Sequence, residues 1–179
     1  MVVLAARAWQ LIVGGDAATV MVSVAVTPAV AWLVFTEEID QWWQRGIRFR
    51  NGGAGVSRMQ LEPGVGGRFF EVLGEGDAAR VVEIGLITRW QPPDRLELTW
   101  RNSNFAAHES TFLEITFEAF GQGTRVTVKH HGWAALPADH PARHGQDAAQ
   151  FIRATGLWWG QLLSVLRDHA SRGRGVVAT

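Results

Sequence analysis

The sequence predicts an α+β protein in which a curved antiparallel sheet wraps around one long C-terminal helix. Three observations predict this class. An early strand is followed by two short helices, alternating segments fill the middle of the chain, and an amphipathic stretch ends it. Such a sheet has one apolar face, which the long helix would cover. A closed barrel of the lipocalin type is the competing architecture, and the helices after the first strand argue against it.

The early strand and the short helices are marked by valines and by a capping pair. Residues 19–26 carry valine at every second position, which is typical of a strand. Thr27 and Pro28 then provide a helix cap and a first-turn proline, so a short helix begins there. A second helical turn is expected over 38–43.

The middle of the chain reads as about six antiparallel strands joined by turns that contain glycine or proline. The clearest strand ranges are 67–73, 81–90, 95–101, 109–119 and 124–131. The ranges 81–90 and 95–101 form a hairpin in which each strand ends in a tryptophan, Trp90 and Trp100. Two such large side chains on one face are more than a thin core needs. The sheet is therefore expected to curve around a thick helix or a hydrophobic cavity. Side chains alternate along a strand, so the inward residues of the first strand of this hairpin are expected to be Val82, Ile84, Leu86, Thr88 and Trp90.

A long helix is predicted over residues 145–169. Its apolar side chains, among them Phe151, Trp158 and Trp159, recur at a spacing close to 3.6 residues. Gly156 and Gly160 lie four residues apart on one face, and each costs about 1 kcal/mol of helix stability relative to alanine. A close approach of this face to the sheet or to another helix is the expected compensation.

Length and composition favour one domain over 18–170, preceded by an extension (1–17) and followed by a flexible tail (171–179). Basic and acidic residues are balanced at 17 each, so no charge footprint indicates nucleic acid or an anionic membrane. The chain has no cysteine, which excludes disulfides and thiolate chemistry. No membrane span is predicted, the first residues lack the basic n-region of a secretory signal, and a cytoplasmic location is the default expectation.

Several short segments resemble one superfamily when they are taken together and in order. They are 28–32, Trp42-Trp43, 63–69, 90–96 with Trp100, 123–128 and 130–133. Across about residues 18–168, the chain resembles the SRPBCC superfamily of START-like, helix-grip proteins. Within it, the chain is most similar to the branch related to the C-terminal domain of heat-shock-chaperone ATPase activators. The resemblance implies a helix-grip fold, but no single activity, because the superfamily includes lipid carriers, hormone receptors and polyketide cyclases.

Aromatic residues with a few polar groups define the predicted site. Bulky flat side chains on a concave sheet leave gaps, and small-molecule pockets are lined mainly by such groups. The sequence therefore predicts binding of a small or medium apolar molecule, aromatic or acyl, between the sheet and the C-terminal helix. The predicted ligand-binding residues are Trp43, Phe70, Thr88, Trp90, Trp100, Thr111, Phe117, His130, Trp133, Phe151 and Trp158.

His130 is the candidate polar group of greatest interest. It follows Val126 and Val128 at a period of two and should face inward. It either contacts a ligand, or is a core histidine satisfied by a backbone carbonyl. Two other functions remain open. One is an enzyme of the cyclase or aromatase type with His130 as its acid and base, and the other is an interaction module of the chaperone-activator type.

No metal and no other cofactor is predicted. His130 and His131 are adjacent strand residues that point to opposite faces, so they cannot easily share an ion. The glycine runs at 52–55 and 64–67 lack the strand-to-helix context of a phosphate loop, and the first is interpreted as a lid over the cavity. Phe112 and other outward apolar side chains leave a homodimer possible.

Overall fold

The computed structural model describes residues 9–53 and 55–173 and contains one eight-stranded antiparallel sheet. The strands are β1 (Trp9–Gly14), β2 (Ala17–Val24), β3 (Ser57–Leu61), β4 (Arg68–Leu73), β5 (Arg80–Gln91), β6 (Arg95–Trp100), β7 (Thr111–Phe120) and β8 (Gly123–His131). The α-helices are α1 (Pro28–Thr36), α2 (Ile39–Trp42) and α3 (Ala148–Arg172). The order across the sheet is β1-β2-β8-β7-β6-β5-β4-β3.

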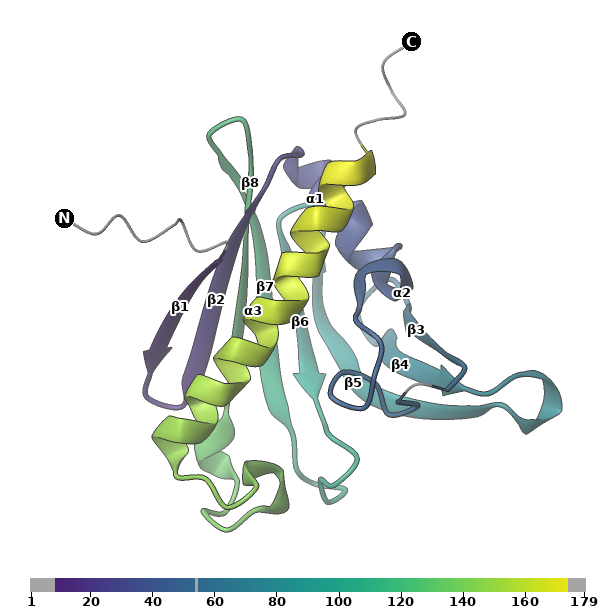
Figure 1. Cartoon of the computed structure of the whole chain (residues 1–179), viewed down its shortest axis with the longest axis vertical. Helices are drawn as coiled ribbons and strands as arrows, with labels where there is room; N and C mark the ends of the chain where they lie inside the picture. The colour runs from purple at the N-terminus through teal and green to yellow at the C-terminus, as the bar shows by residue number, and fades with distance from the viewer. Residues whose placement is uncertain (1–8, 54, 174–179) are drawn as a thin grey trace.

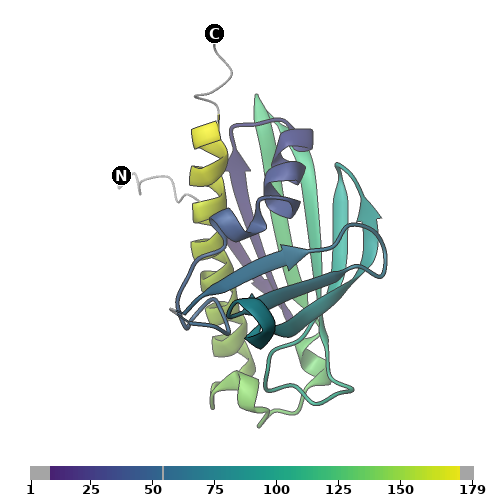
Figure 2. The same ribbon diagram turned by 90° about the vertical axis from the view of Figure 1, so that its right-hand side faces the viewer.

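The sheet curves, and α3 lies across one of its faces (Figure 1). Seen from the side, β3 and β4 cross the direction of the longer strands, and α2 lies between β3 and α3, while α1 packs against the longer strands β7 and β8 (Figure 2). The predicted α+β class, with two short helices after an early strand and a long final helix, is confirmed. The predicted caps are present too, since the Thr27 hydroxyl accepts the Val30 amide hydrogen at the start of α1.

The N-terminal boundary differs from the prediction. Residues 1–17 were expected to form an extension, yet β1 pairs with β2 as an edge strand, from Trp9 opposite Val22 to Gly14 opposite Ala17. Gly15 turns the chain between the two strands with φ of +58°, a conformation that glycine adopts readily. Residues 1–8 lie outside the described residues, as do 174–179 of the predicted tail.

The predicted inner face of β5 is wrong in part, because the pairing of β5 with β4 and its pairing with β6 each contain a bulge. Towards β6, Ile87 pairs with Leu98 and Arg89 with Glu97, so Thr88 is an extra residue. The register also shifts on the β4 side of this strand. A bulge reverses the alternation of side chains beyond it. The buried residues of β5 therefore include Ile87, while Leu86 and Thr88, which were expected to face inward, are exposed.

The two helix glycines have the close contact that the sequence predicts. A Cβ atom at Gly160 would overlap the indole of Trp9, and one at Gly156 would overlap the Leu11 side chain. Helix α3 therefore lies directly on β1 and β2. The contact includes the segment that the sequence assigned to an extension.

Part of the interior, beneath α1 and β1, is closed to solvent. Trp159, Phe117 and Ile115 of this region are at most 2% exposed, and the Phe117 ring packs against Trp32 and Phe35 of α1. Aromatic contacts of this kind bury large areas in preferred edge-to-face geometries. This region is a solid core rather than a binding site.

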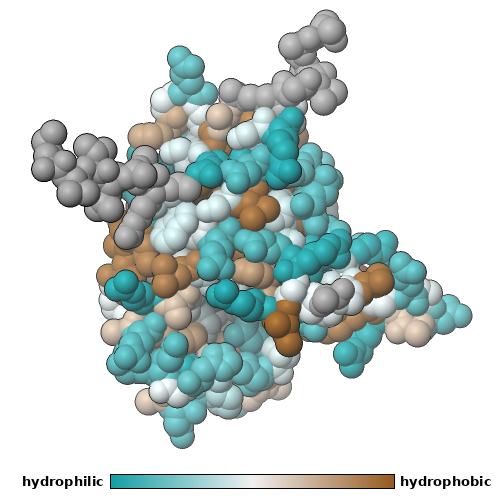
Figure 3. All heavy atoms as spheres, in the orientation of Figure 1, coloured by the Kyte–Doolittle hydropathy of each residue, from teal (hydrophilic) through white to brown (hydrophobic). Residues whose placement is uncertain are grey.

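The face that carries α3 is mostly polar, with an apolar patch along β1 (Figure 3). Ile12 and Val13 of β1 and Leu157 of α3 are exposed there. Within the described residues, no helix combines the length and the apolar character that a membrane crossing requires.

Candidate ligand-binding cavity

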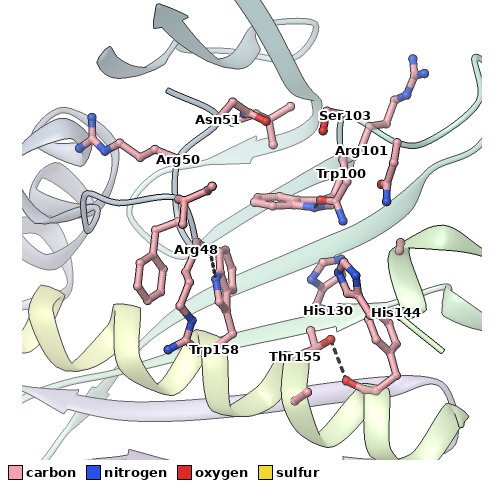
Figure 4. Close-up of a pocket in the computed structure, with 18 of the residues that line it drawn as sticks. Arg48, Arg50, Asn51, Trp100, Arg101, Ser103, His130, His144, Thr155 and Trp158 are labelled. Carbon is pink, nitrogen blue, oxygen red and sulfur yellow. Dashed lines mark hydrogen bonds between the residues drawn. The ribbon is translucent and has the colours of Figure 1, made fainter. Parts of the chain in front are cut away.

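A cavity of about 610 Å³ opens to solvent between the sheet and the N-terminal half of α3 (Figure 4). Three loops complete its wall, at 47–51, 101–104 and 142–146. Small-molecule sites fall in this range of volumes. The apolar lining residues are Trp43, Ile47, Phe49, Val82, Ile84, Trp100, Trp133, Ala142, Phe151, Ala154 and Trp158. The polar ones are Arg48, Arg50, Asn51, Arg101, Asn102, Ser103, Asn104, His130, His144, Gln146 and Thr155.

Three indoles form much of the apolar wall. Trp43 stacks on Trp100 with ring centroids 6.2 Å apart, and it meets Trp158 edge to face at 5.9 Å. Each indole N–H has an acceptor, at 2.9 Å for Trp43, 2.8 Å for Trp100 and 2.7 Å for Trp158. The rings are thus held in place, and what they offer to a ligand is their apolar surface.

The loop between Trp43 and β3 is anchored by a buried arginine. The Arg50 side chain is fully buried and uses all five of its N–H donors. Two of its hydrogen bonds go to Asp40, one to the carboxylate at 2.6 Å and one to the carbonyl oxygen at 3.0 Å. The other three go to the carbonyl oxygens of Gln44, Ser57 and Trp43. The charge of Arg50 is neutralised by Asp40, so this residue has a structural task.

Glu71 fixes the next part of the same loop. Its buried carboxylate accepts the backbone N–H groups of Asn51 at 2.6 Å and Gly52 at 3.1 Å, and the side-chain amide of Asn51 at 3.0 Å. Asp40 is held ionised nearby. Partial burial opposes its charge, but hydrogen bonds from Met59 and Arg50 keep the pKa of Asp40 below its ordinary value. The start of the segment that was predicted to be a lid is therefore tied to the sheet.

His130 lies at the inner end of the cavity and is 2% exposed. The Trp159 indole N–H donates to Nδ1 of His130 at 3.1 Å. Because Nδ1 accepts, the proton of the neutral ring is on Nε2, which donates to the Thr111 hydroxyl at 2.8 Å. Thr111 in turn donates to the carbonyl oxygen of Trp100 at 3.3 Å. The imidazole therefore has both nitrogens in use.

The titration of His130 is strongly shifted. Burial, with a smaller contribution from His131, lowers the pKa of His130 to about 3. The ring is therefore neutral at neutral pH. It lacks both the free nitrogen and the matched pKa that general acid–base catalysis requires. The core interpretation of His130 fits this geometry, with side chains rather than a backbone carbonyl as its partners.

The structure brings together about half of the predicted ligand-binding residues. Those that line the cavity are Trp43, Trp100, His130, Trp133, Phe151 and Trp158. The other five lie elsewhere. Thr111 is buried behind His130, Phe117 is in the closed core, and Thr88 is exposed on its bulge. Phe70 and Trp90 border a separate hollow of about 450 Å³ beside α1 and α2.

Sequence reasoning missed several lining residues. Phe49 stacks on Trp158 with centroids 5.7 Å apart, and the loop after Trp100 contributes Asn102 and Ser103. A signal was present in each case, because an aromatic between two arginines precedes the glycine run, and a run of small polar residues follows a strand-ending tryptophan. Loops that wall a site are often marked in this way.

A curved antiparallel sheet around a long C-terminal helix, with a cavity between them, defines the helix-grip class of START-like proteins. Within this class the family is shown by sequence. The chain belongs to the family described as Activator of Hsp90 ATPase homolog 1-like protein, whose model matches residues 25–163. The predicted resemblance is confirmed at this level. None of the curated proteins matches the chain.

Solved structures share the fold at low sequence identity. A Rhodobacter sphaeroides protein has a TM-score of 0.62 at 18% identity, over 92% of this chain and 98% of that protein. A Nitrosomonas europaea protein has a TM-score of 0.61 at 15% identity, covering 92% and 99% respectively. An Hsp90 activator from Plasmodium falciparum has a TM-score of 0.56 at 15% identity, covering 83% and 91%.

Proposed function

We propose that this protein binds a small or medium, largely apolar molecule in the cavity between the sheet and α3. The open aromatic cavity supports this most directly. Apolar area removed from water contributes about 25 cal/mol per Å², before the cost of association. The indole and phenyl faces would supply that area, and the polar loops at 101–104 and 142–146 would orient the molecule at the mouth.

Trp158 and Trp90 offer a matched pair for testing this proposal. Both are half-buried tryptophans, but only Trp158 lines the cavity, whereas Trp90 packs against Trp32 with centroids 4.9 Å apart. The fluorescent neutral probe N-phenyl-1-naphthylamine should bind the wild type. Trp158→Ala should weaken this binding by about tenfold, as expected for a large apolar contact, and Trp90→Ala should leave it nearly unchanged.

Native mass spectrometry of gently purified protein is the complementary measurement. A co-purifying molecule, released on denaturation, would name the natural ligand chemistry. If no molecule co-purifies and the probe does not bind, the proposal fails. Equal losses for both tryptophan variants, with folding intact by circular dichroism, would place the probe outside the cavity and contradict the proposal as well.

An interaction module of the chaperone-activator type is the second candidate, and family membership favours it. The test is the ATPase rate of an Hsp90-type chaperone with and without the full chain. We expect no stimulation, and a saturable increase in rate would move this candidate to first place. The enzyme hypothesis is weaker, because both nitrogens of His130 are engaged inside the protein.

A further inference from the structure

The charged groups around the cavity point to a particular class of ligand. Among the described residues, none that lines the cavity is acidic, while three are arginines. The residues outside the described ranges contain no acidic side chain either. Because the whole chain has equal numbers of acidic and basic residues, this one-sided lining is a local property of the site.

Two of the three arginines have no carboxylate partner among the described residues. Arg50 is paired with Asp40, as described above. Neither Arg48 nor Arg101 forms an ion pair with any described carboxylate. Arg101 donates to the carbonyl oxygen of Ala106, and its Nε has no acceptor among the described residues. The cavity therefore lies between two uncompensated cations.

The arginines are on the solvent side of the cavity, since Arg48 is exposed and Arg101 half-buried, whereas Trp100 is buried. Figure 4 shows the guanidinium groups of Arg48 and Arg101 turned away from the centre, while Trp100 and Trp158 face the space between them. Low-dielectric walls lined by one sign of charge focus the potential in a cleft and attract counter-ions. An apolar body held among the rings would leave a negative group near the arginines.

We propose that the ligand is an aromatic organic anion, a carboxylate or sulfonate whose flat body enters the cavity and whose charge stays at the mouth, where Arg48 and Arg101 make the potential positive. This inference rests on the proposed ligand-binding function and adds the charge of the ligand to it. Asn102, Ser103 and Asn104 lie on the same rim and provide further hydrogen-bond donors.

Two fluorescent probes with one aromatic body separate the two proposals. They are 8-anilino-1-naphthalenesulfonate, which is an anion, and N-phenyl-1-naphthylamine, which lacks the sulfonate. The ratio of their dissociation constants, measured for each variant, cancels the contribution of the shared body. The double variant Arg48→Gln/Arg101→Gln should lose about tenfold in affinity for the anion, or about threefold per arginine, and little for the neutral probe.

The matched control is Arg125→Gln, which removes one positive charge at the far hairpin, where Arg125 lies over the Phe120 ring. It should leave the ratio unchanged. Raising NaCl from about 0.02 M to about 0.5 M should weaken binding of the anion alone, because exposed charges are screened. The inference is overturned if the ratio is unchanged in the double variant, or if Arg125→Gln lowers the affinity for the anion as much as is expected for each cavity arginine. In both cases the neutral probe still reports on the cavity. If neither probe binds the wild type, the proposed function itself fails.

Discussion

Trp158 and Trp159 are neighbours on α3 whose ring centroids lie 5.1 Å apart, yet one ring borders the open cavity and the other lies in the closed packing behind it. Trp159 is fully buried in the closed region, where its N–H reaches His130. Trp158 is half-buried in the open region, where its N–H reaches a loop carbonyl and its ring borders the cavity. The residue type is the same, so an aromatic side chain alone does not distinguish a core from a binding site.

The covering elements make the difference. The closed region is covered by α1 and by β1. Trp32 of α1 packs against Phe117, and the apolar side chains of β1 pack against the glycines of α3. The open region is covered by loops that are held through polar anchors, above all Arg50 and Glu71. Side chains that hydrogen-bond to loop backbone fix the loop without filling the space beneath it, so a cavity remains.

Replacing each tryptophan with alanine tests whether the two regions differ in packing. Trp159→Ala should destabilise the protein by about 3–5 kcal/mol, because it leaves a large cavity and removes the indole N–H that donates to Nδ1 of His130. Trp158→Ala should cost less than half of that, since its ring already borders solvent. The measurement is urea unfolding followed by circular dichroism. Equal costs would mean that the open region is packed like the closed one.

Acid should weaken the folded protein through His130. The unfolded chain binds a proton at this histidine below its ordinary pKa of 6.5, whereas the folded side chain stays neutral until its pKa of about 3. Folded-state stability that depends on neutral His130 is therefore present above pH 6.5 and is lost as the pH falls towards 3. The loss is about 1.4 kcal/mol for each pH unit in this window.

A variant that does not titrate isolates this effect from the carboxylates. His130→Asn should be less stable than the wild type at about pH 7, and the gap should narrow as the pH falls to about 4.5. Urea unfolding at each pH gives the two curves. Curves that stay parallel would show that His130 does not carry the pH dependence.

Gly160→Ala should have a smaller effect in the closed region. The added methyl overlaps the Trp9 ring, and overpacking costs about 1–3 kcal/mol, which exceeds the gain of about 1 kcal/mol in helix propensity. In a Trp9→Leu background the same substitution should become neutral or stabilising, because the ring has gone. A double-mutant cycle on the unfolding free energies of Gly160→Ala, Trp9→Leu and the double variant measures this coupling. Stabilisation in the wild-type background would contradict the close packing of β1 on α3.

The sequence predicted those features that depend on local patterns. The Thr27-Pro28 cap, the glycine pair of α3 and the inward direction of His130 all follow from spacing and residue type. The two bulges of β5 do not, since they arise from pairing with both neighbouring strands, and Thr88 was misplaced for this reason. The partners of His130 come from β7 and α3, which no spacing in the sequence brings together.

The contact of β1 with α3 brings together the first and the last of the described elements. Gly160 follows Trp9 by 151 positions in the chain, so the face of α3 that carries Gly156 and Gly160 cannot meet β1 until all the residues between them have been synthesised. Until then the β1–β2 hairpin keeps Trp9 and Leu11 uncovered. Exposed apolar surface on partly synthesised chains promotes aggregation, and packing of α3 on β1 therefore also shields this strand.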